Sequence, residues 1–190
     1  MATWAHDETP PPDYPYLKAT AVHSAAVQLY ARSGELVTAN ILKEQKKINH
    51  DNCQLGCHAT ESPRHLFIKC QHYDKWRKEA EREVVEKTKL KAETIGIDKQ
   101  TKCTLVKTAK SLFIDDPRIW LLHSSFYYLG QIPTISKMVQ KASSLTKIQK
   151  RHTIANISAD WHIASIRLAG RIFGDFQRHM AALNQCPTHA

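Results

Sequence analysis

The sequence predicts a mostly α-helical fold, in which a small zinc-held knuckle is inserted between the helices of a helical domain. Apolar residues recur at spacings of three and four through most of the chain, as they do on one face of a helix. Almost no segment shows the alternation of apolar and polar residues that is typical of strands. Residues 49–70, between two of the periodic segments, lack periodicity and instead concentrate cysteine and histidine.

Two helices are predicted before this cysteine-rich segment. Residues 1–16 predict a disordered Pro-rich leader, because prolines among acidic residues favour extended backbone. The apolar spacing then predicts a helix from Leu17 to Ser33, which Gly34 ends. A second, short helix is predicted over residues 36–47.

A strong helix is predicted directly after the cysteine-rich segment. Tyr73, Trp76 and Val84 mark its apolar face, and charged residues mark the other. A polar linker over residues 87–99 leads to the next predicted helix, over residues 99–114.

Asp115, Asp116 and Pro117 mark a break in the helical pattern. Asp116 is suited to cap the next helix and Pro117 to begin it. That helix, which Gly130 ends, is apolar on nearly all sides, so we expect it and its Trp120 to lie centrally in the core.

Two more helices complete the predicted fold, a basic one over residues 133–148 and the longest one over residues 158–183. Gly170 and Gly174 lie four residues apart on the last helix and would let another helix approach closely, so self-association through this helix is one expectation. The predicted organisation has three parts, which are a leader (1–16), helices flanking a CCHC zinc-binding module (17–90, with the module at 49–72) and a C-terminal helical region (98–184).

Cys53, Cys57, His65 and Cys70 stand in the pattern C-x3-C-x7-H-x4-C, which predicts a site for one Zn²⁺. Four protein donors fill a tetrahedral zinc and leave no position for a reacting water, so the site would be structural. Cys70 begins the following helix, where the helix dipole favours a thiolate. His58 is an alternative ligand, and buried free cysteines beside an unrelated histidine are the alternative to a metal site.

The charge of the chain favours a polyanionic partner. Lys and Arg number 27 against 18 Asp and Glu, a net charge of +9, and residues 133–190 hold eight basic but only two acidic residues. Such a surplus suits nucleic acid before a membrane surface. A solvated charged surface without a partner is the alternative.

The cysteine-rich segment and its flanks resemble the C-terminal region of non-LTR retrotransposon (LINE-type) reverse transcriptases. That family has the same C-x3-C-x7-H-x4-C spacing, and residues 61–70 match its "E-[ST]-x-x-H-x-[FL]-x-x-C" core. Ala31-Arg32-Ser33-Gly34 matches the family's lead-in in part, since Glu35 stands where the family has histidine. Residues 126–130 and 160–174 resemble the tail of fungal elements of this kind.

The resemblance implies a region that helps to hold template RNA or target DNA during reverse transcription. The polymerase motif Tyr/Phe-x-Asp-Asp and the motifs of the associated nucleases are not found, so we expect no catalytic activity. A nuclease is disfavoured further because no paired carboxylates have a spacing suited to Mg²⁺. The chain then resembles a detached C-terminal fragment of such an enzyme.

Eight basic residues are the candidates for binding phosphates, five near the knuckle and three further on: Arg64, Lys69, Lys75, Arg77, Lys78, Lys147, Lys150 and Arg151. Phe67, Tyr73 and Trp76 could stack on unpaired bases, but packing in the core is the favoured interpretation.

The sequence leaves two alternatives open. The chain would bind RNA or DNA through a zinc-stabilised module, or it would be a zinc-stabilised structural or protein-interaction module that binds no nucleic acid. Clustered cysteines, and no apolar stretch near the ~20 residues that span a bilayer, favour an intracellular protein of the nucleus or cytoplasm without a membrane partner.

Overall fold

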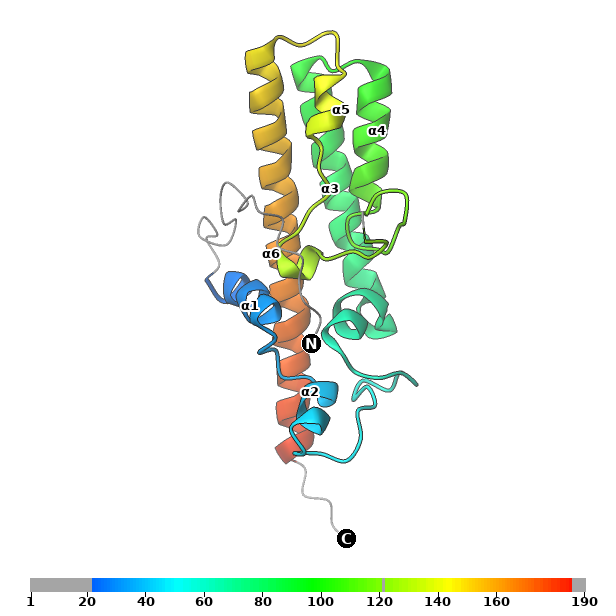
Figure 1. The fold of residues 1–190 in the computed structure, drawn as a ribbon, viewed down its shortest axis with the longest axis vertical. Coiled ribbons are helices and arrows are strands. Elements are labelled where there is room, and N and C mark those ends of the chain that lie inside the picture. Colours follow the sequence, from blue (N-terminus) through cyan, green and yellow to red (C-terminus); the bar gives the residue numbers. More distant parts are fainter. Residues whose placement is uncertain (1–21, 121, 186–190) are drawn as a thin grey trace.

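Three helices form the main bundle of the protein (Figure 1). In the computed structural model, which describes residues 22–120 and 122–185, they are α3 (Asp74–Ile95), α4 (Lys99–Lys110) and α6 (Lys147–Gln185). Helix α3 packs against both of the others and runs antiparallel to them. The predicted mostly helical fold with a Cys/His segment between helices is confirmed. The predicted leader lies outside the described residues.

Shorter elements surround this bundle: α1 (Val22–Ser33), α2 (Ala39–Glu44), the π-helix η2 (His65–Lys69), the 3₁₀-helices η3 (Gln71–Tyr73) and η4 (Tyr127–Leu129), and α5 (Ser136–Gln140). The helix predicted over residues 36–47 is thus reduced to α2. Strand-type pairing within the described ranges is limited to one antiparallel bridge, between Asn52 and Thr60. None of the described helices combines the length and the apolar character that crossing a bilayer requires.

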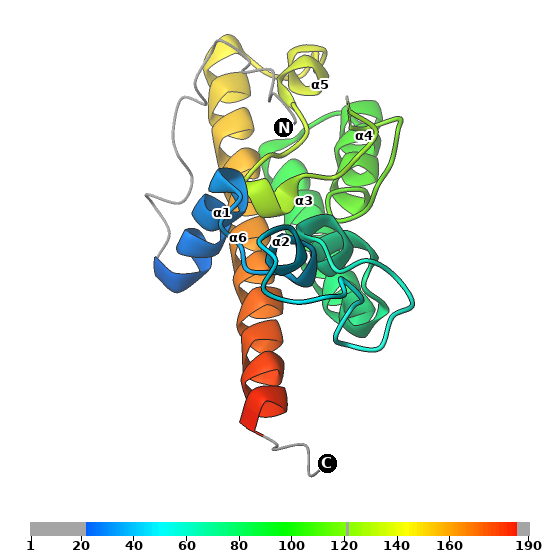
Figure 2. The same ribbon diagram turned by 60° about the horizontal axis from the view of Figure 1, so that its bottom comes forward.

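Helix α1 lies directly on α6 at Gly170 (Figure 2). A Cβ atom at position 170 would come within 2.5 Å of Ser24 Cβ and 2.7 Å of Ser24 Cα, so only glycine allows this approach. The predicted close helix contact is therefore made within the chain at Gly170. At Gly174 the nearest atom to such a Cβ is His23 Nε2, at 3.7 Å, which is an ordinary contact distance.

One hydrophobic cluster extends from α1 to α6 and includes buried side chains of both predicted helical regions, among them Val27, Tyr73, Leu105, Trp161 and Phe176. Because α6 contacts α1, α3, α5 and the elements beside the knuckle, this helix joins the two regions. The division into the two regions stays a prediction.

Helix α3 continues through most of the segment that its composition assigned to a polar linker. Its second half is held by α6, since Trp161 Nε1 donates to Thr88 Oγ1 at 2.9 Å and Lys91 pairs with Asp160 at 2.6 Å. A polar outer face does not end a helix whose inner face is buried. The helix ends at Gly96, whose φ of 77° is the left-handed conformation of a helix C-cap.

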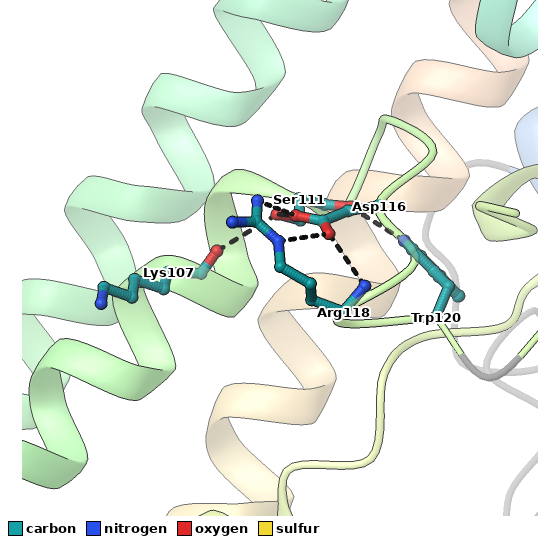
Figure 3. A network of polar contacts seen from close by, with 5 residues as sticks. All are labelled: Lys107, Ser111, Asp116, Arg118 and Trp120. Atoms are coloured by element: carbon teal, nitrogen blue, oxygen red, sulfur yellow. Dashed lines mark hydrogen bonds and ion pairs between the residues drawn. The ribbon is translucent and has the colours of Figure 1, made fainter. Parts of the chain in front are cut away.

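The helix predicted over residues 116–130 does not form, and this prediction is wrong: the described residues there adopt turns and η4. Asp116 does accept the backbone N–H of Arg118, at 3.0 Å, as a capping residue would. Its carboxylate also accepts bonds from the Ser111 hydroxyl (2.9 Å) and the Arg118 guanidinium (Figure 3). The Arg118 side chain is the main cause that lowers the pKa of Asp116.

Contacts back to the end of α4 explain why a closed loop replaces the predicted helix. Trp120 Nε1 donates to the carbonyl of Ser111 at 2.9 Å, and Ser125 Oγ donates to the carbonyl of Leu112 at 2.7 Å (Figure 3 shows the Trp120 bond). A helix that began at Pro117 would carry Ser125 about 12 Å along its axis, because each residue rises ~1.5 Å. The loop keeps these buried polar groups paired, and the helix would not.

The predicted boundaries of the last two helices are also wrong. Helix α5 is only five residues long, and α6 begins at Lys147 and not near residue 158. Thr146 and Gln149 account for this start, since the Gln149 N–H donates to Thr146 Oγ1 (3.3 Å) and the Thr146 N–H donates to Gln149 Oε1 (2.8 Å). This reciprocal pair is a capping box, and its T-x-x-Q signature is present in the sequence.

His162 makes the stability of this fold depend on pH. Its Nδ1 is buried without a hydrogen-bond partner among the described residues, and burial, with a smaller effect of Arg32, lowers its pKa from 6.5 to about 4. Between those values the unfolded chain binds more protons than the folded one, so stability falls as the pH falls from about 6.5 towards 4.

We therefore expect the free energy of unfolding to drop between pH 7 and pH 5 by about 1 to 2 kcal/mol more in the wild type than in His162→Leu. Urea unfolding of both proteins at a series of pH values measures this difference. Parallel pH profiles of the two proteins would contradict the role of His162.

Candidate metal centre

Cys53, Cys57, His65 and Cys70 come together in space, as their spacing predicts. Their candidate ligand atoms, one from each residue, all lie within 4.8 Å of one another, and the Sγ atoms of Cys57 and Cys70 are 3.6 Å apart. Cys53, His65 and Cys70 are buried, and Cys57 is half-buried. Within the described ranges, this is the only group of three or more Cys, His, Asp or Glu side chains with such a geometry.

The first two ligands lie on a short, tightly bonded loop. The Gly56 N–H donates to the carbonyl of Cys53 at 3.2 Å, and Gly56 has a φ of 84°, which favours glycine. The Cys53 N–H donates to the carbonyl of Ala59 at 2.9 Å, and the Ala59 N–H donates to the carbonyl of Cys57 at 2.8 Å. These bonds turn the chain so that both sulfurs reach the same side.

The other two ligands lie at the two ends of a π-helical turn. The N–H of Cys70 donates to the carbonyl of His65 at 2.6 Å, which is the i to i+5 pattern of a π-helix. Residues five apart are on different sides of an α-helix with 3.6 residues per turn, and the wider π-turn brings them nearer to one side. Ser62 lies just before the helical residues that lead into the turn, and its Oγ accepts the His65 N–H at 3.1 Å. The H-x4-C spacing therefore corresponds to this π-turn.

Arg77, on α3, holds the π-turn in place through hydrogen bonds. Its buried guanidinium donates to the carbonyls of Phe67 (3.1 Å) and Cys70 (2.6 Å) and pairs with Asp74. Tyr127 Oη donates to the same Phe67 carbonyl at 3.0 Å. Arg77 was predicted to contact phosphates, and its burial corrects that interpretation, because its guanidinium is used inside the protein.

Glu61 links the knuckle to helix α2. Its side chain is 1% exposed, and its two carboxylate oxygens accept the N–H groups of Ala39 (2.8 Å) and Gln54 (2.9 Å). Gln54 directly follows the ligand Cys53, so Glu61 supports the position of that cysteine. The candidate residues indicated by the sequence did not include Glu61.

Burial dominates the protonation of the ligands. It raises the pKa of Cys53, raises that of Cys70 to about 12, and lowers that of His65. The dipole effect expected to favour a Cys70 thiolate is therefore outweighed by desolvation. A metal cation would supply the positive charge that these buried sulfurs need to become thiolates.

The donor set fits one metal ion. His65 Nε2 is buried and has no hydrogen-bond partner among the described residues, which leaves a nitrogen lone pair available beside three sulfurs. His58, the alternative ligand, is exposed and is not part of the group. Nearby His72 instead faces Asp175, with Nε2 and Oδ2 at 3.8 Å.

The candidate phosphate-binding residues fall into two groups at opposite ends of the bundle (Figure 1). Near the knuckle, Arg64 and Lys69 both pair with Asp115, at 2.6 and 2.9 Å, which partly neutralises them. Lys75 and Lys78 are exposed on α3. The remaining three candidates lie in the first turns of α6, at the other end: Lys147, Lys150 and Arg151.

The aromatic residues of the knuckle pack in the core, as the favoured interpretation had it. Phe67 is fully buried and stacks on Tyr128 with ring centroids 4.9 Å apart, and Tyr73 is fully buried as well. Trp76 is partly buried, and the Arg171 guanidinium lies 4.2 Å from its ring centroid. In this structure Phe67 and Tyr73 present no face to a base.

Replacing Glu61 by glutamine is expected to weaken both the fold and metal binding. Glutamine has one acceptor oxygen for two N–H donors, so one buried donor loses its partner, at a cost of about 1 to 3 kcal/mol. Loss of this support is expected to lower metal affinity by about 10-fold or more. Chemical unfolding and competition with a chelator measure the two effects. The exposed Glu86, replaced in the same way, should leave both unchanged, and equal behaviour of the two variants would contradict this role.

Comparison of the chain with protein-family models, with curated proteins and with solved structures found no significant match.

Proposed function

We propose that the protein is a nucleic-acid-binding module without catalytic activity of its own, held together by one structural Zn²⁺. The observation that carries the proposal is the closed group of three sulfurs and one imidazole nitrogen within 4.8 Å. A structural site needs four protein donors, and this group supplies them.

Zinc is the metal that this donor set favours. Thiolate with imidazole in a four-donor arrangement is typical of structural zinc, whereas calcium and magnesium require oxygen donors. When it is bound, the ion would join the loop of Cys53 and Cys57 to the π-turn of His65 and Cys70. Among the described residues no backbone hydrogen bond joins these two segments, so the ion would order the knuckle.

Nucleic acid is the partner that the charge favours. The chain has a net charge of +9, and the C-terminal part of the chain contains very few acidic residues. The resemblance of the cysteine-rich segment to retrotransposon reverse transcriptases supports the same partner class, RNA or DNA, and we propose an origin from such an enzyme.

Binding to nucleic acid at increasing salt concentration tests this function. We expect the zinc-loaded protein to bind a labelled RNA or DNA of about 20 nucleotides at ~50 mM salt, with an affinity that falls steeply by ~200 mM. No detectable binding to single-stranded RNA, single-stranded DNA or duplex DNA at the lower concentration would contradict it.

A zinc-stabilised structural or protein-interaction module is the second candidate. The pairing of Arg64 and Lys69 with Asp115 and the burial of Phe67 favour it, since they remove cations and aromatic faces from the knuckle surface. The same binding experiment separates the two, because this second candidate predicts no affinity for nucleic acid.

A further inference from the structure

A long segment of the chain contains cations and no carboxylates. Residues 117–159 include no Asp or Glu, although they include five Lys and Arg residues in the segment 137–151. We call these five residues the basic corner: Lys137, Lys141, Lys147, Lys150 and Arg151. Figure 1 shows that α5 and the start of α6, which hold them, lie together at the end of the bundle remote from the knuckle.

The charges of the basic corner are not compensated within the protein. Among the described residues, none of the five forms an ion pair, and the one hydrogen bond from their charged groups runs from Lys150 Nζ to the carbonyl of Gln140 (2.8 Å). At the knuckle the candidate cations are compensated in part, since Arg64 and Lys69 pair with Asp115 and Arg77 is buried, whereas Lys75 and Lys78 are exposed and form no ion pair among the described residues.

The positions of these cations cost stability. Lys147, Lys150 and Arg151 lie in the first turns of a 39-residue helix, where the helix dipole repels positive charge. Lys147 and Arg151 are also four residues apart on one helix face, and like charges at that spacing repel. An anion bound at this end would reverse both effects.

A cavity of about 340 Å³, with Met138 in its wall, adjoins the basic corner between the start of α4 and α5. Lys137 and Lys141 contribute to its wall, and neutral groups able to bind phosphate or sugar oxygens supply much of the rest: Gln100, Thr101, Thr104 and Ser143. Asp98 is the carboxylate in this wall, and its Oδ1 accepts the Thr101 N–H at 2.9 Å.

We propose that the basic corner is the main surface through which the protein binds the sugar–phosphate backbone of nucleic acid. This inference rests on the proposed function and places its binding surface at the end opposite the zinc site. Residues 130–159 contain no Phe, Trp or Tyr, and the exposed His152 is the one aromatic ring among them, so cations far outnumber groups able to stack on bases. The contacts are therefore to phosphates, and binding has little sequence preference.

Neutralising the basic corner tests the proposal. The variant Lys141→Gln/Lys147→Gln/Arg151→Gln leaves the Lys150 bond in place, and fluorescence anisotropy measures its affinity for a labelled mixed-sequence single-stranded RNA of about 20 nucleotides. We expect an affinity about 10- to 100-fold below wild type at ~100 mM salt, and a salt slope smaller by about 2, because three phosphate contacts are lost.

A matched control variant has the same net charge as the triple variant of the basic corner. The variant Lys89→Gln/Lys107→Gln/Lys110→Gln removes three exposed lysines of α3 and α4 that form no ion pair among the described residues, and we expect its affinity to fall less than about threefold. Circular dichroism and zinc content should match wild type in both variants.

The outcomes separate the two proposals. If wild type binds RNA and both triple variants lose affinity equally, binding follows net charge and the basic corner is not the binding surface. If wild type binds no nucleic acid, the proposed function itself fails. Binding of wild type to phosphatidylserine vesicles without RNA binding would assign the basic corner to a membrane surface and overturn the proposal.

Discussion

Replacing Cys70 by serine is expected to abolish stoichiometric zinc binding and to unfold the knuckle. Cys70 is fully buried, it is one of the four metal ligands, and its carbonyl accepts a bond from Arg77. Structural zinc contributes about 10 to 16 kcal/mol of binding free energy in small zinc-binding peptides, so even partial loss exceeds the effect of most core substitutions. We expect the melting temperature to fall by more than about 10 °C.

Cys103→Ser is the matched control for this experiment. Cys103 is an exposed cysteine on α4 and is not part of the ligand group, so its replacement should leave zinc content and melting temperature unchanged. Calorimetry and metal analysis on the three purified proteins measure both quantities. A Cys70→Ser protein that keeps its zinc and its melting temperature would contradict the metal site.

Replacing Gly170 by alanine is expected to destabilise the contact between α1 and α6. The added Cβ would lie 2.7 Å from the backbone Cα of Ser24, which cannot move without shifting α1. Overpacking of this kind costs about 1 to 3 kcal/mol, which lowers the melting temperature of a chain of this size by about 3 to 10 °C.

Gly174→Ala is the matched control for this substitution. It lies one helical turn later, and its added Cβ would have no neighbouring atom closer than 3.7 Å. Alanine is the better helix former by about 0.5 to 1 kcal/mol, so this variant should be as stable as wild type or slightly more stable. Thermal unfolding followed by circular dichroism compares the two. Equal melting temperatures of the two variants would show that α1 does not pack on Gly170.

The sequence predicted the structure best at two kinds of position. These are metal ligands that lie close together in the chain, and a helix contact that only glycine allows. The four ligands follow from their spacing alone, because few arrangements of cysteine and histidine explain such a cluster. The close contact at Gly170 follows from the requirement for a residue without Cβ. In both cases the type of the residue itself, a metal-binding side chain or a glycine, is sufficient for the prediction, and no knowledge of the neighbouring residues is needed.

Features that depend on contacts between distant parts of the chain could not be predicted from the sequence. The segment around Trp120 has the apolar content of a central helix, yet bonds from Trp120 and Ser125 to carbonyls at the end of α4 hold it as a loop. In the sequence, Arg77 stands among the charged residues of a helix, which predicts an exposed cation. The structure shows that it is buried against the π-turn. The start of α6 is a different case, since the capping box of Thr146 and Gln149 was visible in the sequence.

The sequence indicated five candidate phosphate-binding residues near the knuckle and three further on, and the structure puts these two groups at opposite ends of the bundle. The Cys/His group organises the segment between α2 and α3, while the five cations of the basic corner, which form no ion pair among the described residues, lie at the far end of the bundle. We propose that the metal would support the fold and that the basic corner would contact nucleic acid.

X-ray absorption spectroscopy of the purified protein tests the central claim most directly, because it reports the identity of the metal and its donors together. The account predicts zinc at one equivalent per chain, with three sulfur neighbours near ~2.3 Å, one nitrogen near ~2.0 to 2.1 Å and no fifth ligand. A zinc content below about half an equivalent after metal-replete purification, or a shell dominated by oxygen, would contradict a closed structural site at Cys53, Cys57, His65 and Cys70.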